Sequence, residues 1–118
     1  MSTGTPDKVF IEDSEIEWES VGEGVKRKIV AYDDQLMLTK VAFEKGGVGA
    51  LHQHHHSQIS HVESGAFEIQ IGDEKKLLRA GDAFRIPPHV IHGAVCMEAG
   101  VLVDAFSPYR EDFIQQSK

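Results

Sequence analysis

Residues 46–65 read GGVGALHQHHHSQISHVESG and hold five histidines and four glycines. His52 and His54 are one residue apart, so on an extended strand both imidazoles leave the same face of a sheet. Gln58 lies an even number of positions further along and can return to that face after a short turn. Two imidazoles and an amide oxygen directed at one point predict three corners of a metal site.

The other histidines of the chain are expected to stay outside this site. His55 has the opposite strand parity, His56 falls at the expected turn, and His61 faces away from Gln58. His89 follows two prolines and is expected in a loop. A histidine-rich run can also be an adventitious metal binder. This run is internal and interrupted, which favours a built site.

The charge pattern excludes one class of partner. The chain carries 19 acidic and 12 basic residues, a net charge of −7, and its basic residues are scattered. Nucleic-acid binding needs a clustered cationic face, so we expect no nucleic-acid partner. The apolar content of 41% is that of a folded protein, and 118 residues suffice for a single domain with its own core.

Cysteine use and hydropathy indicate the compartment. The single cysteine, Cys96, excludes an internal disulfide, which fits a reducing compartment, and its parity with Ala94 predicts a core position. The sequence shows no signal-peptide pattern and no apolar run near the roughly 20 residues that a bilayer requires. We therefore expect a cytoplasmic protein with no membrane partner.

Short runs of alternating polar and apolar residues, separated by turn signals such as Gly72-Asp73, fill most of the chain. The pattern predicts strands at 9–11, 16–18, 25–32, 35–43, 59–62, 66–71, 75–78, 83–86, 92–97 and 101–106. Residues 45–49 are expected to break the sheet, and 112–116 to form a short C-terminal helical turn. Many short strands of this kind predict an all-β barrel or sandwich. Residues 1–118 are expected to form one domain with its core over about 25–113 and a flexible terminus at 1–8.

At this point the sequence resembles the cupin family. The first cupin motif has a glycine, then H-x-H, an acidic or amide residue and a glycine, and the matching residues here are Gly47, His52, His54, Gln58 and Gly65. The stretch GDAFRIPPHVIH resembles the second motif at Gly81, Pro87 and His92. The resemblance implies a jelly-roll barrel, also described as a double-stranded β-helix.

The same resemblance implies a divalent metal inside the barrel, held by His52, His54, Gln58 and His92. Nickel, zinc, iron and manganese are the candidate ions, and imidazole suits the first three of them. Gln58 stands where many cupins have glutamate. A neutral amide leaves the full +2 charge on the ion, so the site should hold manganese less well and attract anions more strongly. This favours Lewis-acid chemistry over redox chemistry.

The C-terminal segment VLVDAFSPYREDF, residues 101–113, adds a second signal. Asp104 shares a strand face with Leu102 and Phe106, so a carboxylate flanked by apolar side chains should point into a polar cavity. Arg110 follows a Ser-Pro turn and can fold over the mouth of the pocket. The structural alternative is an Asp104–Arg110 salt bridge that ties down the C-terminal segment.

This D-x-F-x-x-x-R ending, together with H-x-H-x-x-x-Q and I-P-P-x-x-x-H, is similar to the KdgF-type pectin-degradation cupins. Those proteins convert 4,5-unsaturated uronates into open-chain ketouronates. The resemblance implies that Asp104, Phe106 and Arg110 form the catalytic or substrate-binding set. A guanidinium can bind the uronate carboxylate, and a carboxyl can move the proton during ring opening. The expected partner is therefore a small anionic carbohydrate-derived substrate.

Two other functions stay open at the level of sequence. An iron-dependent dioxygenase or lyase on the same scaffold would retain iron after aerobic purification and consume oxygen with its substrate. A non-catalytic metabolite-binding cupin would bind a ligand without turnover. The resemblance also implies a homodimer that pairs or exchanges its N-terminal strands.

Overall fold

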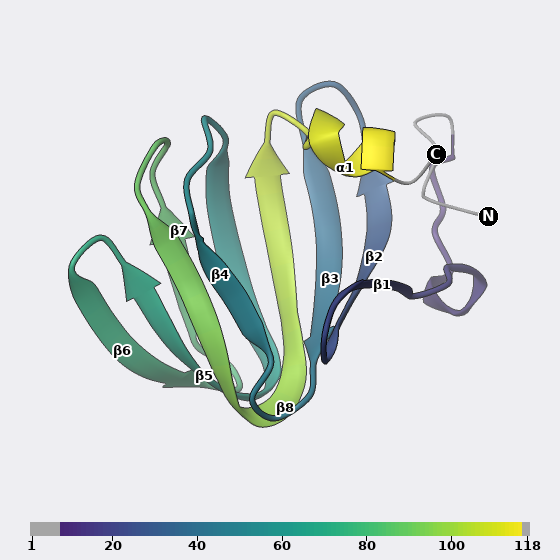
Figure 1. Cartoon of the computed structure of the whole chain (residues 1–118). Coiled ribbons are helices and arrows are strands. Elements are labelled where there is room, and N and C mark those ends of the chain that lie inside the picture. Colours follow the sequence, from purple (N-terminus) through teal and green to yellow (C-terminus); the bar gives the residue numbers. More distant parts are fainter. Residues whose placement is uncertain (1–7, 117–118) are drawn as a thin grey trace.

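The computed structural model describes residues 8–116 and is built almost entirely from strands (Figure 1). The expected flexible terminus therefore lies almost wholly outside the described residues. In chain order the described elements are η1 (Asp13–Glu15), β1 (Glu19–Gly22), β2 (Val25–Tyr32), β3 (Met37–Phe43), β4 (Val48–His52), β5 (Ser57–Ile71), β6 (Glu74–Arg79), β7 (Ala83–Ile86), β8 (His92–Ser107) and α1 (Glu111–Gln116).

The two longest strands, β5 and β8, join two layers into one barrel. They pair antiparallel with each other along most of their length. The C-terminal half of β8 pairs with β3, and its N-terminal half pairs with β4. The path β1-β2-β3-β8-β5-β6 is extended by β7 on β5. The all-β jelly-roll arrangement predicted from the sequence is confirmed.

Four of the predicted strands merge into these two. Segments 59–62 and 66–71 belong to the single strand β5, and 92–97 and 101–106 belong to β8. Gly65 has a φ of 82°, and a Cβ there would come within 2.5 Å of the Glu98 carbonyl oxygen. A Cβ on Gly100 would collide with the Ser64 backbone. The glycines thus mark a tight bend where the two paired strands come very close together, at positions that the sequence pattern left as breaks between predicted strands.

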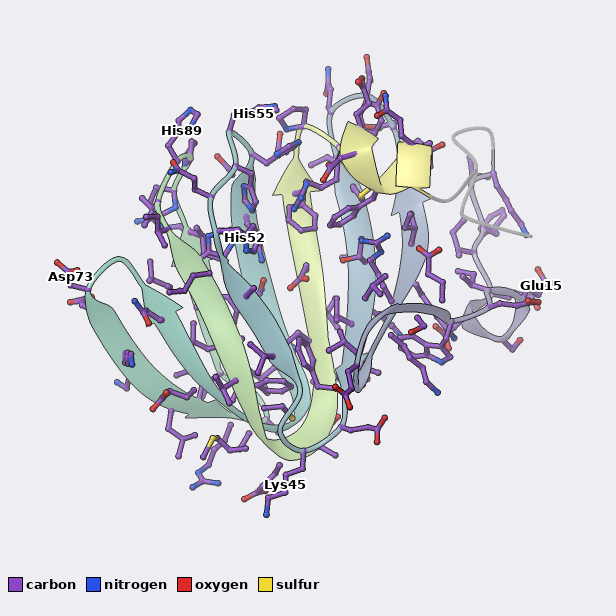
Figure 2. The ribbon with its side chains drawn as sticks, viewed as in Figure 1. Glu15, Lys45, His52, His55, Asp73 and His89 are labelled. Atoms are coloured by element: carbon purple, nitrogen blue, oxygen red, sulfur yellow. The ribbon has the colours of Figure 1, made fainter. Side chains whose placement is uncertain are left out.

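The bend defines two ends of the barrel. Lys45 lies at the end where β5 and β8 bend, which we call the closed end (Figure 2). His55, His89 and the helix α1 lie at the opposite end, which we call the open end (Figures 1 and 2). The side chains that face inward from β5 and β8 can therefore be assigned to the closed end or to the open end of the barrel.

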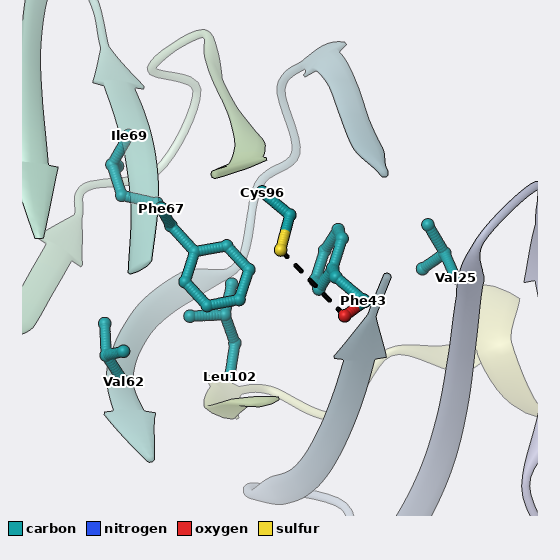
Figure 3. Packing of buried hydrophobic residues seen from close by; sticks show 7 residues of the cluster. All are labelled: Val25, Phe43, Val62, Phe67, Ile69, Cys96 and Leu102. Atoms are coloured by element: carbon teal, nitrogen blue, oxygen red, sulfur yellow. Dashed lines mark hydrogen bonds between the residues drawn. The ribbon is translucent and has the colours of Figure 1, made fainter. Parts of the chain in front are cut away.

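An apolar cluster fills the space toward the closed end (Figure 3). Its fully buried members include Phe67 and Val62, each with no exposed surface. Phe43 meets the Phe67 ring edge-on, with 5.2 Å between centroids. The predicted core position of Cys96 is confirmed, and its thiol lies 3.9 Å from the Phe43 carbonyl oxygen. The complete cluster is Val25, Phe43, Val62, Phe67, Ile69, Cys96 and Leu102.

The N-terminal predictions were wrong. Segments 9–11 and 16–18 are not strands, and the structure instead has η1 followed by β1. Side-chain contacts, rather than sheet hydrogen bonds, hold the residues before β1 in place. The Asp13 carboxylate contacts Lys28 at 3.3 Å and Lys40 at 3.2 Å, and the Lys28 ammonium lies 4.7 Å from the centroid of the Trp18 ring.

Two further local predictions can be compared with the structure. The break expected over 45–49 is confined to the turn before Val48, where β4 begins. Gly49 lies within this strand and pairs with Ala94 of β8, so a residue that looked like a breaker does not interrupt the sheet. The C-terminal helical turn is confirmed as α1. Within residues 8–116, none of the helical segments has the length and apolar character to cross a membrane.

Candidate metal centre

Three histidines from separate elements meet toward the open end. His52 is the last residue of β4, His54 lies in the following loop, and His92 is the first residue of β8. A ring nitrogen of each lies within 4.8 Å of one in the others. The expected strand does not extend to His54. The convergence arises because β4 pairs His52 with His92 and the loop then returns His54 toward both.

The backbone sets the orientation of all three imidazole rings. Each Nδ1 contacts a carbonyl oxygen two residues away: His52 to Ala50 at 2.8 Å, His54 to His56 at 3.1 Å and His92 to Val90 at 2.9 Å. A carbonyl oxygen only accepts, so each Nδ1 carries the proton and donates. Each neutral ring therefore keeps a lone pair on Nε2, which is how metal-binding histidines are usually held.

Burial favours the neutral, metal-binding form of two of these rings, His54 and His92. Desolvation lowers the pKa of His92 to about 4, and it also lowers the pKa of His54, with the nearby Arg110 charge as the next cause. The Nε2 atom of His92 is buried and has no hydrogen-bond partner among the described residues. A buried acceptor without a partner is unfavourable, and a cation at the meeting point would satisfy it.

Gln58, the second residue of β5, completes the set. Its Oε1 atom lies 3.0 Å from Nε2 of His54. The His54 Nε2 is already an acceptor, because its Nδ1 donates to the backbone, so two lone pairs face each other. A metal ion held by His54 and Gln58 would relieve this repulsion. The three imidazoles and one amide oxygen therefore fit a divalent transition metal such as zinc, nickel or iron.

Asp104 points into the barrel as predicted, since its neighbours Leu102 and Phe106 are buried on the same face. Asp104 is 8% exposed, and its carboxylate accepts a hydrogen bond of 2.6 Å from the Ser60 hydroxyl. Burial raises the pKa of Asp104 to about 6, although Ser60 and Arg110 act in the opposite direction. The sequence reasoning did not select Ser60, although it shares the inward parity of Gln58 on β5.

Arg110 follows β8 and is held by α1 rather than by Asp104. Its Nε and Nη2 atoms donate to the Asp112 carboxylate at 3.0 and 2.8 Å. The guanidinium lies 5.0 Å from the centroid of the Phe106 ring and 4.0 Å from that of Phe113. Among the ion pairs of residues 8–116, Arg110 is joined to Asp112 and not to Asp104. The alternative of an Asp104–Arg110 salt bridge was therefore wrong, and Asp112 was not anticipated.

A cavity of about 130 Å³ brings most of the predicted site residues together. Its lining includes His52, Gln58, His92, Asp104, Phe106 and Arg110. Phe84, Ile86 and Phe113 add an apolar wall.

The remaining histidines lie outside the cluster of three. His55, His61 and His89 are exposed. His56 is buried, and the centroid of its ring lies 5.3 Å from that of His54. Desolvation is the main cause that lowers the pKa of His56 to about 4.

Comparisons with known proteins agree with this architecture. A family model described as "Cupin domain" matches residues 39–106. The chain is 46% identical over 109 residues to the pectin degradation protein KdgF of Dickeya dadantii, covering 91% of this chain and 98% of that protein. The solved structure of KdgF from a Halomonas species is 44% identical with a TM-score of 0.87, covering 90% of this chain and 98% of that one. An RmlC-like cupin from Shewanella frigidimarina is 45% identical with a TM-score of 0.88, covering 91% of this chain and 96% of that one.

Proposed function

Because this chain belongs to the cupin family and is a KdgF homologue, we propose that it acts in pectin degradation as a metal-dependent isomerase. The substrate would be a 4,5-unsaturated uronate, and the product an open-chain ketouronate. The observation that carries the proposal is the cavity itself. Three of the four proposed metal ligands face the same small space as Asp104, Phe106 and Arg110.

The proposed reaction is an isomerisation that needs no external oxidant or reductant. The anomeric hydroxyl loses its proton, the bond between the anomeric carbon and the ring oxygen breaks, and its electron pair goes to that oxygen. An aldehyde and an enolate result, and addition of a proton at the former alkene carbon C4 gives the ketone. One proton leaves oxygen and one proton is added to carbon, so the reaction is an isomerisation with no net gain or loss of protons.

Asp104 is the proposed carrier of that proton. A carboxyl whose pKa lies at about 6 populates both protonation states near neutral pH, so it can accept a proton and return it. Its hydrogen bond from Ser60 fixes one carboxylate oxygen, which leaves the other directed to the reacting atoms. The buried position excludes water from this transfer.

Arg110 is the proposed anchor for the uronate carboxylate. Asp112 engages the Nε and Nη2 atoms of its guanidinium, and the ring of Phe113 lies 4.0 Å from its centre. These contacts hold the guanidinium beside the cavity and leave Nη1 as the donor for an anion. Phe106 forms the apolar surface between this anchor and the histidines.

His52, His54, Gln58 and His92 would hold the metal. When bound, the ion supplies Lewis-acid stabilisation of negative charge that develops on substrate oxygens. Gln58 contributes no charge to this set, which strengthens the attraction for an anionic substrate. The identity of the metal, the homodimer and the cytoplasmic location stay predictions.

Loss of ultraviolet absorbance from an unsaturated uronate tests the proposal. The wild-type protein, with its metal content measured, should consume the absorbing substrate without consuming oxygen, whereas His54→Ala should not. Equal rates for the two proteins would overturn the proposed site. Oxygen uptake during turnover would instead support the iron-dependent dioxygenase, and ligand binding without turnover would support the metabolite-binding alternative.

A further inference from the structure

Ser60 connects the candidate metal ligands to the candidate proton carrier. Its side chain has no exposed surface, and on the sheet it pairs with Asp104 of β8. Gln58 Nε2 lies 2.9 Å from the Ser60 oxygen, which in turn lies 2.6 Å from Asp104 Oδ1. These contacts form one buried chain that runs from the amide to the carboxyl group.

The donors and acceptors of this chain can be arranged in one direction. An ionised carboxylate only accepts hydrogen bonds, so the single hydroxyl proton of Ser60 goes to Asp104. The Ser60 oxygen can then only accept from Gln58, which requires the amide NH2 group to face it. The amide oxygen of Gln58 is consequently turned toward His54, at 3.0 Å.

We propose that Ser60 is a positioning residue that fixes the polarity of the Gln58 amide and so makes its oxygen available to the metal. This inference rests on the proposed metal site. A reversed amide would direct its NH2 group at the ion, and that group has no lone pair to donate. A carboxylate at this position could present either of its oxygens to the metal, whereas a glutamine can bind through only one of its two terminal atoms. Ser60 ensures that this atom is the oxygen.

Thr39 provides a matched comparison on the other side of Asp104. It pairs with Asp104 from β3, is fully buried, and carries a hydroxyl with no hydrogen-bond partner among the described residues. Two buried hydroxyls thus flank one carboxylate, and Ser60 is the one that also contacts a candidate ligand. Thr39→Val removes a buried hydroxyl while keeping the side-chain shape.

The test measures zinc affinity by competition with a chromogenic chelator, without any turnover assay. Ser60→Ala should weaken zinc binding about 10-fold or more, which is typical when the partner that orients a ligand is lost. Thr39→Val should change the affinity less than about threefold. Ser60→Thr, which keeps the hydroxyl, should retain most of the affinity.

A second background separates orientation from a general structural effect. With Gln58→Glu, either terminal oxygen can face the metal, so adding Ser60→Ala should cause little further loss of zinc affinity. A merely structural role for Ser60 would give the same loss in both backgrounds and would overturn the proposal. Unchanged zinc affinity of Ser60→Ala would also overturn it. Failure of the wild-type protein to bind zinc, nickel or iron would count against the metal site itself.

Discussion

The closed and open ends of the barrel use the same two strands for opposite purposes. Toward the closed end, β5 and β8 contribute Val62, Phe67 and Cys96 to an apolar cluster. Toward the open end, the inward positions of the same strands carry Gln58 and Asp104 together with Ser60 and His92. Burial of apolar side chains stabilises the fold, whereas burial of polar groups opposes it unless each has a partner. We infer that apolar packing at the closed end offsets the free-energy cost of burying polar groups at the open end.

The largest effect on stability is expected at the closed end. Phe67→Ala removes a fully buried ring from the apolar cluster and should lower the free energy of unfolding by about 3–5 kcal/mol. Urea denaturation measures this loss. Leu77→Ala, at a residue 44% exposed, is the control and should have a much smaller effect. Equal losses for the two variants would contradict the division between the ends.

Asp104→Asn should have the opposite effect on stability and should abolish turnover. The folded-state pKa of about 6 lies above the usual aspartate value of 3.8, so the unfolded chain releases its proton first as the pH rises. The ionised carboxylate therefore destabilises the fold above about pH 6, by up to about 3 kcal/mol. The neutral asparagine should remove this penalty, raising the melting temperature of the metal-free protein at pH 8.

The pH dependence of that stabilisation gives a separate prediction. Below about pH 4 both the folded and the unfolded wild-type chains carry a protonated Asp104, so the penalty vanishes. The difference in unfolding free energy between wild type and Asp104→Asn should therefore shrink as the pH falls from 8 to 4. Denaturant titrations at several pH values measure it. A difference that is constant over this range would show that burial of the charge is not its cause.

A smaller effect is expected at the mouth of the pocket. Arg110→Lys keeps the charge but loses the planar contacts with Asp112 and Phe113, so kcat/KM for the uronate should fall about 10- to 100-fold. Asp112→Asn should lower it only a few-fold, because the ring contacts of Arg110 remain. Steady-state kinetics of both variants measure the two effects. A larger loss for Asp112→Asn would mean that the ion pair, and not the guanidinium, governs substrate binding.

The sequence was most informative where the signal is local. Strand parity placed Asp104 inside the barrel and excluded His61, whereas His54 meets His52 from the loop after β4 and not from the expected strand. These predictions depend on the two-residue period of a strand and not on which strands are neighbours. The turn residues likewise sufficed to predict an all-β fold.

The features that were missed depend on tertiary register. The link from Ser60 to Asp104 spans 44 residues and exists only because β5 pairs with β8 in one alignment. Gly65 and Gly100 fall in gaps between the predicted strands, although their lack of a side chain allows the continuous strands β5 and β8 to come close together at the bend. The N-terminal segment is held by charged side chains from β2 and β3, which no local pattern indicates.

Removal and return of the metal test the central claim most directly. The protein should be stripped with a chelator, assayed for loss of unsaturated-uronate absorbance, and assayed again after stoichiometric zinc, nickel or iron is added. Metal-dependent turnover predicts that activity is lost on stripping and is restored by at least one of these ions in the wild type, but by none in His54→Ala. Full turnover by the stripped wild-type protein would contradict it.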